Sequence, residues 1–283
     1  MSNIKIVTDS SVALTAEEVK TYGIYIVPLS VQIDGTVYED GITIQPNEFL
    51  EKMATSQSLP QTSQPAIGKF TAVYNEIAQQ YPDDEILSLH LSSRLSGTIH
   101  AAEQAAALTN AKVTTFDTLS TDRGQAFMVI EAAKMVANGA TMTEILDKLL
   151  EVRDQTHIFL SFTSLNNMVA GGRLSKTQGM IGNLLNIKVG AGVDKEGAVE
   201  VLAKGRGMKA IAKFHDSVID GMKAYSEVMS IGISHAGIPE VAEKMAARLQ
   251  TLFPETPIVT QVTTPIVSTH TGAGALAIIY RAR

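Results

Sequence analysis

The chain of 283 residues contains no cysteine and no tryptophan, and only 5% of its residues are aromatic. Without cysteine there can be no disulfide, no thiolate metal ligand and no cysteine nucleophile. So few aromatic side chains make a surface that stacks on nucleic-acid bases unexpected. The net charge of −6 also opposes binding to a phosphate backbone. Because this field repels anions in general, an anionic ligand would need local hydrogen-bond donors.

Long apolar runs are absent as well. No window approaches the roughly 20 consecutive apolar residues of a membrane span. The opening residues, MSNIKIVTDSS, are typical of a strand and not of a signal peptide. We therefore expect a soluble cytoplasmic protein. A chain of 283 residues exceeds the size at which a single core usually stops growing, so two domains are expected.

The first half of the chain alternates predicted strands with predicted helices. Asp34-Gly35, flanked by alternating apolar residues, indicates a β-hairpin. Because strands separated by helices form a mostly parallel sheet with helices on both faces, residues 1–156 are expected to form such an α/β domain. The predicted strands cover residues 4–7, 85–91 and 112–116. The predicted helices cover residues 15–22, 46–53, 67–78, 96–108, 124–137 and 143–153.

The second half, residues 157–283, is expected to form a second α/β domain. It opens with a strand over residues 157–162, followed by a Gly-rich stretch and a hairpin over residues 187–203 that turns near residues 195–197. The boundary is placed near Thr156, and the final segment could return to either domain. Two such lobes in contact form a cleft, where ligands commonly bind. The remaining elements are helices over 208–225 and 239–252 and strands over 228–234 and 257–262.

Small and hydroxyl residues gather in four segments, mostly just after predicted strands. In an α/β sheet such positions lie at the carboxyl ends of the strands, where ligands bind. They also lie at helix N-termini, whose free N–H groups favour anions. The four segments are TDSS (residues 8–11), TSQ (62–64), SSRLSGT (92–98) and HTGAG (270–274).

Each of these segments also has an ordinary structural interpretation. The first suits a turn or a helix cap, and a lone histidine such as His270, in a predicted loop, is often only structural. Arg94 stands two residues before Ser96, so the G-x-S-x-G elbow of a hydrolase is missing. No Walker loop, dinucleotide fingerprint or metal-ligand spacing is present, and no metal or cofactor is expected. The residues alone thus predict an α/β protein with an anion pocket.

At these segments the sequence resembles the DegV family over essentially its whole length. The motifs occur in family order: TDSS, TSQP at residues 62–65, SSRLSGT, GGRL at 171–174, NIK at 186–188, and HTGAG. Three positions depart from the family pattern. Ala273 replaces the proline of HTGPG, Val189 replaces the proline of Ile-Lys-Pro, and Gly205 replaces the commoner valine of Lys-Val-Arg.

The resemblance implies a two-domain α/β protein with a long-chain fatty acid in a tunnel between the domains. It implies that Thr62, Ser96 and His270 hold the acyl carboxylate. It also implies a carrier, without a chemical step of its own, that presents the fatty acid to a separate kinase subunit, which makes acyl-phosphate for phospholipid synthesis. Lys204 and Arg206 correspond to the basic pair that meets this kinase.

Two other functions remain open at this point. One is a binder of a different amphiphile without a kinase partner, because one fold can host many ligands. The other is a lipid or thioester hydrolase with Ser96 as nucleophile, His270 as base and Asp9 as the residue that orients the base, since these residue types suit a triad.

Overall fold

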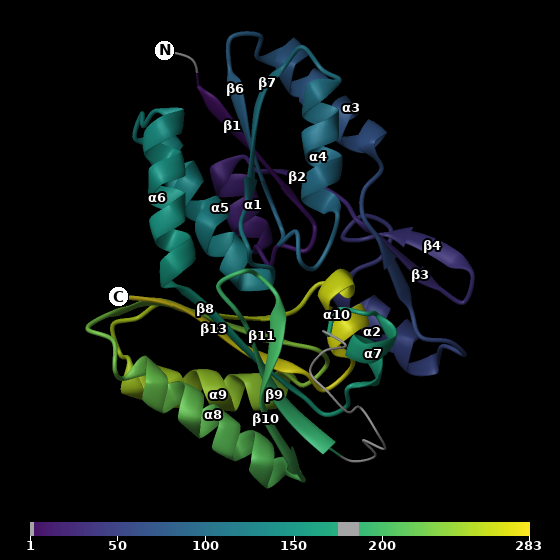
Figure 1. The fold of residues 1–283 in the computed structure, drawn as a ribbon, viewed down its shortest axis with the longest axis vertical. Helices are drawn as coiled ribbons and strands as arrows, with labels where there is room; N and C mark the ends of the chain where they lie inside the picture. Colours follow the sequence, from purple (N-terminus) through teal and green to yellow (C-terminus); the bar gives the residue numbers. More distant parts are fainter. Residues whose placement is uncertain (1–2, 175–186) are drawn as a thin grey trace.

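Two large β-sheets, one in each half of the chain, organise the molecule, and helices cover them (Figure 1). The computed structural model describes residues 3–174 and 187–283. The part of the Gly-rich stretch beyond Leu174, and Asn186 of the NIK motif, lie outside the described residues. The expected fold, two α/β domains with a parallel sheet in the first, is confirmed.

The first sheet contains four parallel strands in the order β2-β1-β6-β7. They are β1 (Ile4–Asp9), β2 (Tyr25–Val27), β6 (Glu85–His90) and β7 (Lys112–Asp117). α3 (Ile67–Gln80) and α4 (Thr98–Ala107) pack on one face around Phe70 and Tyr74. The other face is covered by α1 (Ala16–Tyr22), α5 (Asp122–Ala137) and α6 (Met142–Gln155).

A small antiparallel sheet, β4-β3-β5, projects from this half. It consists of β3 (Ser30–Ile33), β4 (Thr36–Glu39) and β5 (Gln61–Ser63), with α2 (Pro46–Thr55) in the connection. The predicted hairpin at Asp34-Gly35 is confirmed, since both residues have positive φ as a tight two-residue turn requires. The sequence did not predict β5, whose pairing with β3 brings Thr62 opposite Val31.

The second sheet has six strands in the order β10-β9-β8-β13-β11-β12. They are β8 (Thr156–Phe162), β9 (Ile187–Val193), β10 (Val199–Arg206), β11 (Val228–His235), β12 (Ile258–Val262) and β13 (Leu276–Ala282). The final segment, β13, lies antiparallel between β8 and β11, so it belongs to this sheet. The outer helices are α8 (Met208–Met222) and α9 (Pro239–Leu252), and two short helices are α7 (Asn166–Ala170) and α10 (Pro265–Thr271).

The two halves share one hydrophobic core, which runs from β1 and β6 through α5 to β8 and β13. The chain crosses between the sheets where α6 ends and β8 begins, and we propose the domain boundary there, near Thr156. No helix within residues 3–174 and 187–283 has the length and apolar character needed to cross a bilayer.

One local prediction was wrong, and another was confirmed only in part. His270 lies in the last turn of α10 and not in a loop, because Pro265 and the capping hydroxyl of Thr264 start a helix there. Ser10 and Ser11 of the TDSS segment form a turn, which is one of the two structures expected for it, but the segment does not cap α1, whose N-cap is Thr15. Asp9 instead accepts hydrogen bonds from the backbone and hydroxyl of Ser11.

Candidate functional site

A cavity lies between the two halves, with about 820 Å³ of empty space including the part open to solvent. Its wall is formed by loops of the first half, by β8 and β13, by the β9–β10 hairpin and by α10. Twelve apolar side chains contribute to it: Leu29, Leu91, Leu95, Ile158, Leu160, Met168, Val193, Val199, Ile266, Val267, Ala277 and Ile279. Eight polar residues share the wall: Thr62, Gln64, Ser96, Thr121, Asp122, Arg173, His270 and Thr271.

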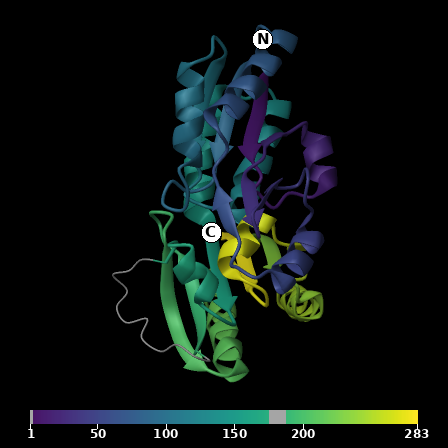
Figure 2. The ribbon, with the colours of Figure 1, turned by 90° about the vertical axis from the view of Figure 1, so that its right-hand side faces the viewer.

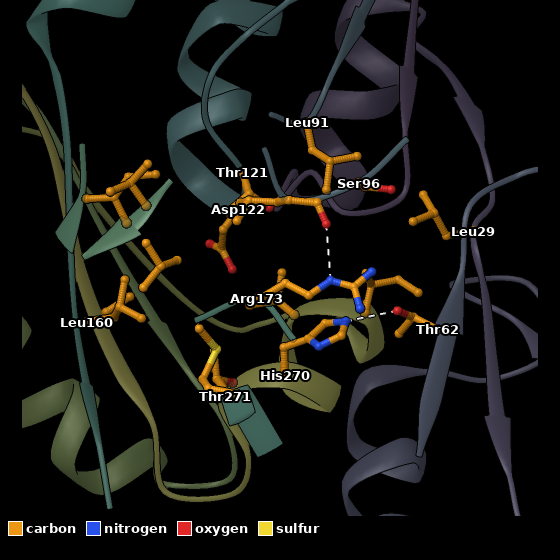
Figure 3. A pocket seen from close by; sticks show the side chains of 18 of the residues that line it. Leu29, Thr62, Leu91, Ser96, Thr121, Asp122, Leu160, Arg173, His270 and Thr271 are labelled. Carbon is orange, nitrogen blue, oxygen red and sulfur yellow. Dashed lines mark hydrogen bonds between the residues drawn. The ribbon is translucent and has the colours of Figure 1, made fainter. Parts of the chain in front are cut away.

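Thr62 and His270 meet at one end of this cavity. The Oγ1 atom of Thr62 on β5 lies 2.8 Å from Nε2 of His270 at the end of α10 (Figure 3). These residues are 208 positions apart in the chain. They meet because α10 packs against both β5 and β3 at the level where the two halves join (Figure 2).

Glycine 171 makes room for the His270 ring. A Cβ atom at Gly171 would lie 2.3 Å from Nδ1 of His270, much closer than real Cβ contacts. Asn167 of α7 adds support, because its side-chain amide donates to the carbonyl of Thr269 over 3.0 Å. The GGRL motif thus begins with a glycine that the histidine requires.

Arg173 is a site residue that residue-level reasoning missed. Its guanidinium lies beside His270 (Figure 3). It donates to two backbone carbonyls, of Leu95 at 3.2 Å and of Gly171 at 2.5 Å. Burial, and then the positive charge of Arg173, lower the pKa of His270 to about 4, so the ring is neutral at pH 7. Among the described residues, Nδ1 of His270 is buried without a hydrogen-bond partner. The neutral imidazole of His270, with one nitrogen free, and the half-buried cation of Arg173 beside it can together bind an anion.

Ser96 lines the same cavity but forms no hydrogen bond with Thr62 or His270. It follows β6 in the loop before α4, where its Oγ lies 2.8 Å from Oγ1 of Thr98 and accepts from the Thr98 amide at 3.3 Å. Its neighbour Gly97 faces Gln64, whose Oε1 would be 2.2 Å from an added Cβ. The structure therefore places all three predicted head-group residues in one cavity wall, and only Thr62 and His270 are bonded to each other.

The same end of the cavity borders a groove on the outside of the protein. The groove has about 620 Å³ of empty space, including the part open to solvent, and a more polar wall than the cavity. Three residues, Thr62, Arg173 and His270, line both spaces. A group bound between them would have apolar surroundings on one side and an open polar surface on the other.

The structure does not assemble the triad of the hydrolase hypothesis. The fully buried carboxylate of Asp9 is bonded to Nδ1 of His90 at 3.0 Å, to the Leu91 amide at 3.0 Å and to Ser11. Burial alone would raise the pKa of Asp9, but the hydrogen bond and charge of His90 hold it below its usual value. Asp9 thus belongs to a separate buried network, and His270 uses Thr62 as its partner among the described residues.

Lys204 and Arg206 lie away from the cavity. Both are exposed on β10, the edge strand of the second sheet, and neither lines the cavity or the groove. Within residues 3–174 and 187–283 neither forms an ion pair with a carboxylate. Over the same residues no group of three or more potential metal ligands is found.

Comparison with known proteins agrees with this arrangement. A two-domain α/β protein that encloses a mostly apolar cavity is the class that the fold and site define. The model of the DegV family, described as uncharacterised protein, DegV family, matches residues 3–283. This chain belongs to the DegV family.

Relatives match over nearly their whole length. The DegV domain-containing protein YejH of Lactococcus lactis is 43% identical over 277 residues, which are 98% of this chain and 98% of that protein. DegV from Bacillus subtilis, described as a fatty acid binding protein, has a TM-score of 0.90 at 28% identity and covers 100% of both chains. A DegV family protein from Thermus thermophilus, described by its fatty acid binding, has a TM-score of 0.86 at 29% identity and covers 99% of this chain and 100% of its own.

Proposed function

We propose that this protein binds a long-chain fatty acid in the cavity and presents its carboxylate, in the cytoplasm, to a partner fatty-acid kinase. The observation that carries the proposal is that Thr62, Arg173 and His270 line both the apolar cavity and the outer groove. A fatty acid whose carboxylate lies there would keep its tail in the cavity and its carboxylate oxygens at the groove. The fatty-acid binding of the B. subtilis and T. thermophilus relatives supports the same ligand class.

The tail supplies most of the affinity. Burial of an acyl chain contributes roughly 0.8 kcal/mol per methylene, or on the order of 10 kcal/mol for a chain of about sixteen carbons before the costs of binding. The twelve apolar side chains of the cavity wall provide this environment.

The carboxylate needs donors because an unpaired buried anion is costly. Thr62 and Ser96 offer hydroxyls, His270 an imidazole and Arg173 a guanidinium. Each hydroxyl can turn from its present partner, His270 or Thr98, toward a carboxylate oxygen. An anion near Arg173 and His270 also offsets the positive charge of Arg173, which adds to the effect of burial in lowering the pKa of His270.

The chemical step belongs to the kinase. A carboxylate oxygen attacks the γ-phosphorus of ATP, the bond to the bridging oxygen of ADP breaks, and acyl-phosphate and ADP result. This carrier contributes position and charge, which dominate catalysis of phosphoryl transfer. We assign Lys204 and Arg206 to contact with the kinase, since they are exposed and lie on an edge strand apart from the ligand. The acyl-phosphate would then serve phospholipid synthesis.

Analysis of the ligand extracted from purified protein tests the proposal. Mass spectrometry should find a long-chain fatty acid in stoichiometric amount. Recovery of a different amphiphile would show that the ligand is not a fatty acid. An acyl adduct on Ser96 would support the hydrolase hypothesis instead.

We call the part of the cavity wall formed by Thr62, Ser96, Arg173 and His270 the head-group wall. Substitutions in it test whether these residues present the carboxylate to the kinase. Thr62→Ala, Ser96→Ala and His270→Ala should each reduce acyl-phosphate formation with the kinase and ATP, because each removes a partner worth about 1–3 kcal/mol to a buried anion. Lipid can stay bound through its tail. Thr62→Ala should also lower stability, since it leaves Nε2 of His270 unpaired, whereas Ser96→Ala should affect stability less. If a variant shows wild-type turnover, the substituted residue does not contribute to presentation of the carboxylate.

A further inference from the structure

A buried carboxyl group, that of Asp122, stands in the wall of the tail cavity. Asp122 is only 3% exposed and lines the cavity with apolar residues such as Ile158 and Leu160. Its φ of 54° lies in the left-handed region, which aspartate and asparagine tolerate better than most residues. Burial raises the pKa of this carboxyl, because the charged form is poorly stabilised away from water. A buried carboxyl group in the wall would not favour the binding of a chain made only of methylene groups.

Three donors contact the carboxyl and hold it in place. The Arg123 amide donates to Oδ1 over 2.7 Å, the Ser234 hydroxyl donates to Oδ1, and the Thr263 hydroxyl donates to Oδ2. These bonds join the start of α5 to the ends of β11 and β12. A carboxylate has about four acceptor positions, so among the described residues Oδ2 retains one. The group is both fixed and able to take a further donor.

A second polar group in the same cavity lacks a partner. The Oγ1 atom of Thr271, the last residue of α10, is buried and has no hydrogen bond among the described residues. Buried hydroxyls without partners are rare in native proteins. In Figure 3, Asp122 and Thr271 lie on the Leu160 side of Arg173, whereas Thr62 lies on the opposite side. A chain that extends from the head group toward Leu160 therefore passes both.

We propose that the cavity selects a long-chain acid that carries a hydroxyl group partway along its chain, and that Asp122 is the residue that binds this hydroxyl. The inference rests on the proposed function, since the carboxylate must lie at Thr62 and His270. Thr271 provides a second contact on the same stretch of chain.

A hydroxyl group fits this wall better than a carbonyl group does. It can donate to Asp122 as a carboxylate and accept from Asp122 as a carboxylic acid, whereas a carbonyl suits only the acid. An unsubstituted chain would leave the free acceptor of Asp122 and the hydroxyl of Thr271 in apolar surroundings without partners. Leaving a buried polar group unsatisfied is unfavourable, so the two kinds of ligand should differ in affinity.

The test compares stearic acid with a series of stearic acids that carry a single hydroxyl at successive positions. Delipidated wild-type protein should bind the best of the hydroxy acids about tenfold more tightly than stearic acid at neutral pH, because the added hydrogen bond satisfies a buried polar group that would otherwise lack a partner. Affinity should peak at one or two adjacent positions, because the fixed carboxylate end sets the distance to Asp122. Equal or weaker binding of every hydroxy acid would overturn the inference.

Variants test whether Asp122 and Thr271 cause the preference for a hydroxy acid over stearic acid. Asp122→Asn keeps the left-handed conformation and the shape, and should cut the preference to about threefold or less because a neutral acceptor is weaker. Thr271→Val, which keeps the branched shape, should also reduce it. Asp147→Asn is the matched control, since it makes the same change at an exposed position of α6 outside the cavity, and it should keep the preference. If Asp122→Asn weakens both ligands equally, Asp122 only joins the two halves and the inference fails.

The two proposals fail in different ways. If wild-type protein binds neither stearic acid nor any hydroxy acid, the proposed function itself is wrong. If it binds stearic acid well and shows no preference for a hydroxyl, only the role of Asp122 is wrong.

Discussion

At the scale of single residues, the head-group wall depends on how little space surrounds His270. Thr62 contacts one nitrogen of the ring and Gly171 lies against the other. Gly171 has an ordinary helical φ of −73°, so an alanine there would not strain the backbone. Its missing side chain matters because of the histidine, and that allows the position of His270 to be tested without altering His270 itself.

Gly171→Ala should displace the His270 ring and break its bond to Thr62. We expect acyl-phosphate formation to fall about as far as in His270→Ala, by roughly tenfold or more for a lost contact of about 1.4 kcal/mol or above. Gly68→Ala in α3 is the matched control, because no atom lies within 4 Å of the added Cβ. It should keep full turnover and gain about 0.5–1 kcal/mol in stability. Full turnover in Gly171→Ala would show that the ring position is unimportant.

The lowered pKa of His270 predicts a pH-dependent stability for the ligand-free protein. Between its folded pKa of about 4 and its ordinary value near 6.5, the unfolded state binds a proton that the folded state does not, so stability falls as the pH falls. From pH 7 to pH 5 this histidine should cost about 2 kcal/mol. Urea unfolding at both pH values should therefore show a smaller loss for His270→Asn than for wild type. Equal losses would mean that folding does not lower the pKa of His270.

At the scale of elements, short segments position the head-group wall. β5 has three residues and α10 seven, and neither would be stable alone. Asp40, which follows β4 and is buried, helps to anchor them. It accepts from the Ser10 hydroxyl at 2.9 Å and from the backbone of Ile266 at the start of α10. The group thus joins the small sheet, the loop after β1 and the helix that carries His270.

Asp40→Asn should stabilise the protein more at high pH than at low pH. Burial, and then the nearby charge of Asp9, raise the pKa of Asp40 to about 7, so the folded state binds a proton that the unfolded state loses above about pH 4. Wild type accordingly loses stability as the pH rises toward 7, whereas asparagine keeps a neutral group. The advantage of Asp40→Asn in urea unfolding should grow by up to about 3 kcal/mol from pH 5 to pH 8. A constant difference would contradict this assignment.

At the scale of the whole molecule, one continuous core joins the two halves. α5 contacts strands of both large sheets, and Arg123 near its start pairs with Glu18 at 2.6 Å. The bonds of Asp122 to Ser234 and Thr263 connect the same helix to the second sheet. The cavity therefore lies between parts that are held together, while the β10 edge with Lys204 and Arg206 faces outward.

Arg206→Ala should separate ligand binding from kinase docking. The variant should bind fatty acid like wild type and support much less acyl-phosphate formation, with a defect that shrinks as salt rises and screens the wild-type attraction. Lys20→Ala on α1 removes the same charge from an exposed site on the other half, and should leave both properties unchanged. Weaker ligand binding would place Arg206 at the cavity, and no change in either assay would leave it as an ordinary surface residue.

The sequence by itself determined the larger elements and the fold class. Periodic apolar residues predicted the long helices and the buried strands, and Asp34-Gly35 predicted its hairpin, because these signals are local. The motifs TSQP, LSGT and HTGAG were enough for a resemblance to the DegV family. They indicated Thr62, Ser96 and His270 as candidates but could not show that Thr62 and His270 touch across 208 positions.

Only the tertiary structure decided what surrounds those residues. β5 and α10 were missed or misassigned because three to seven residues carry too little periodicity, and their stability comes from packing on distant segments. Arg173 belonged to the predicted Gly-rich stretch and Asp122 preceded the predicted helix over 124–137, yet both stand in the cavity wall. Burial, charge and hydrogen-bond partners depend on contacts between residues far apart in the chain. Local sequence patterns do not encode which distant groups meet.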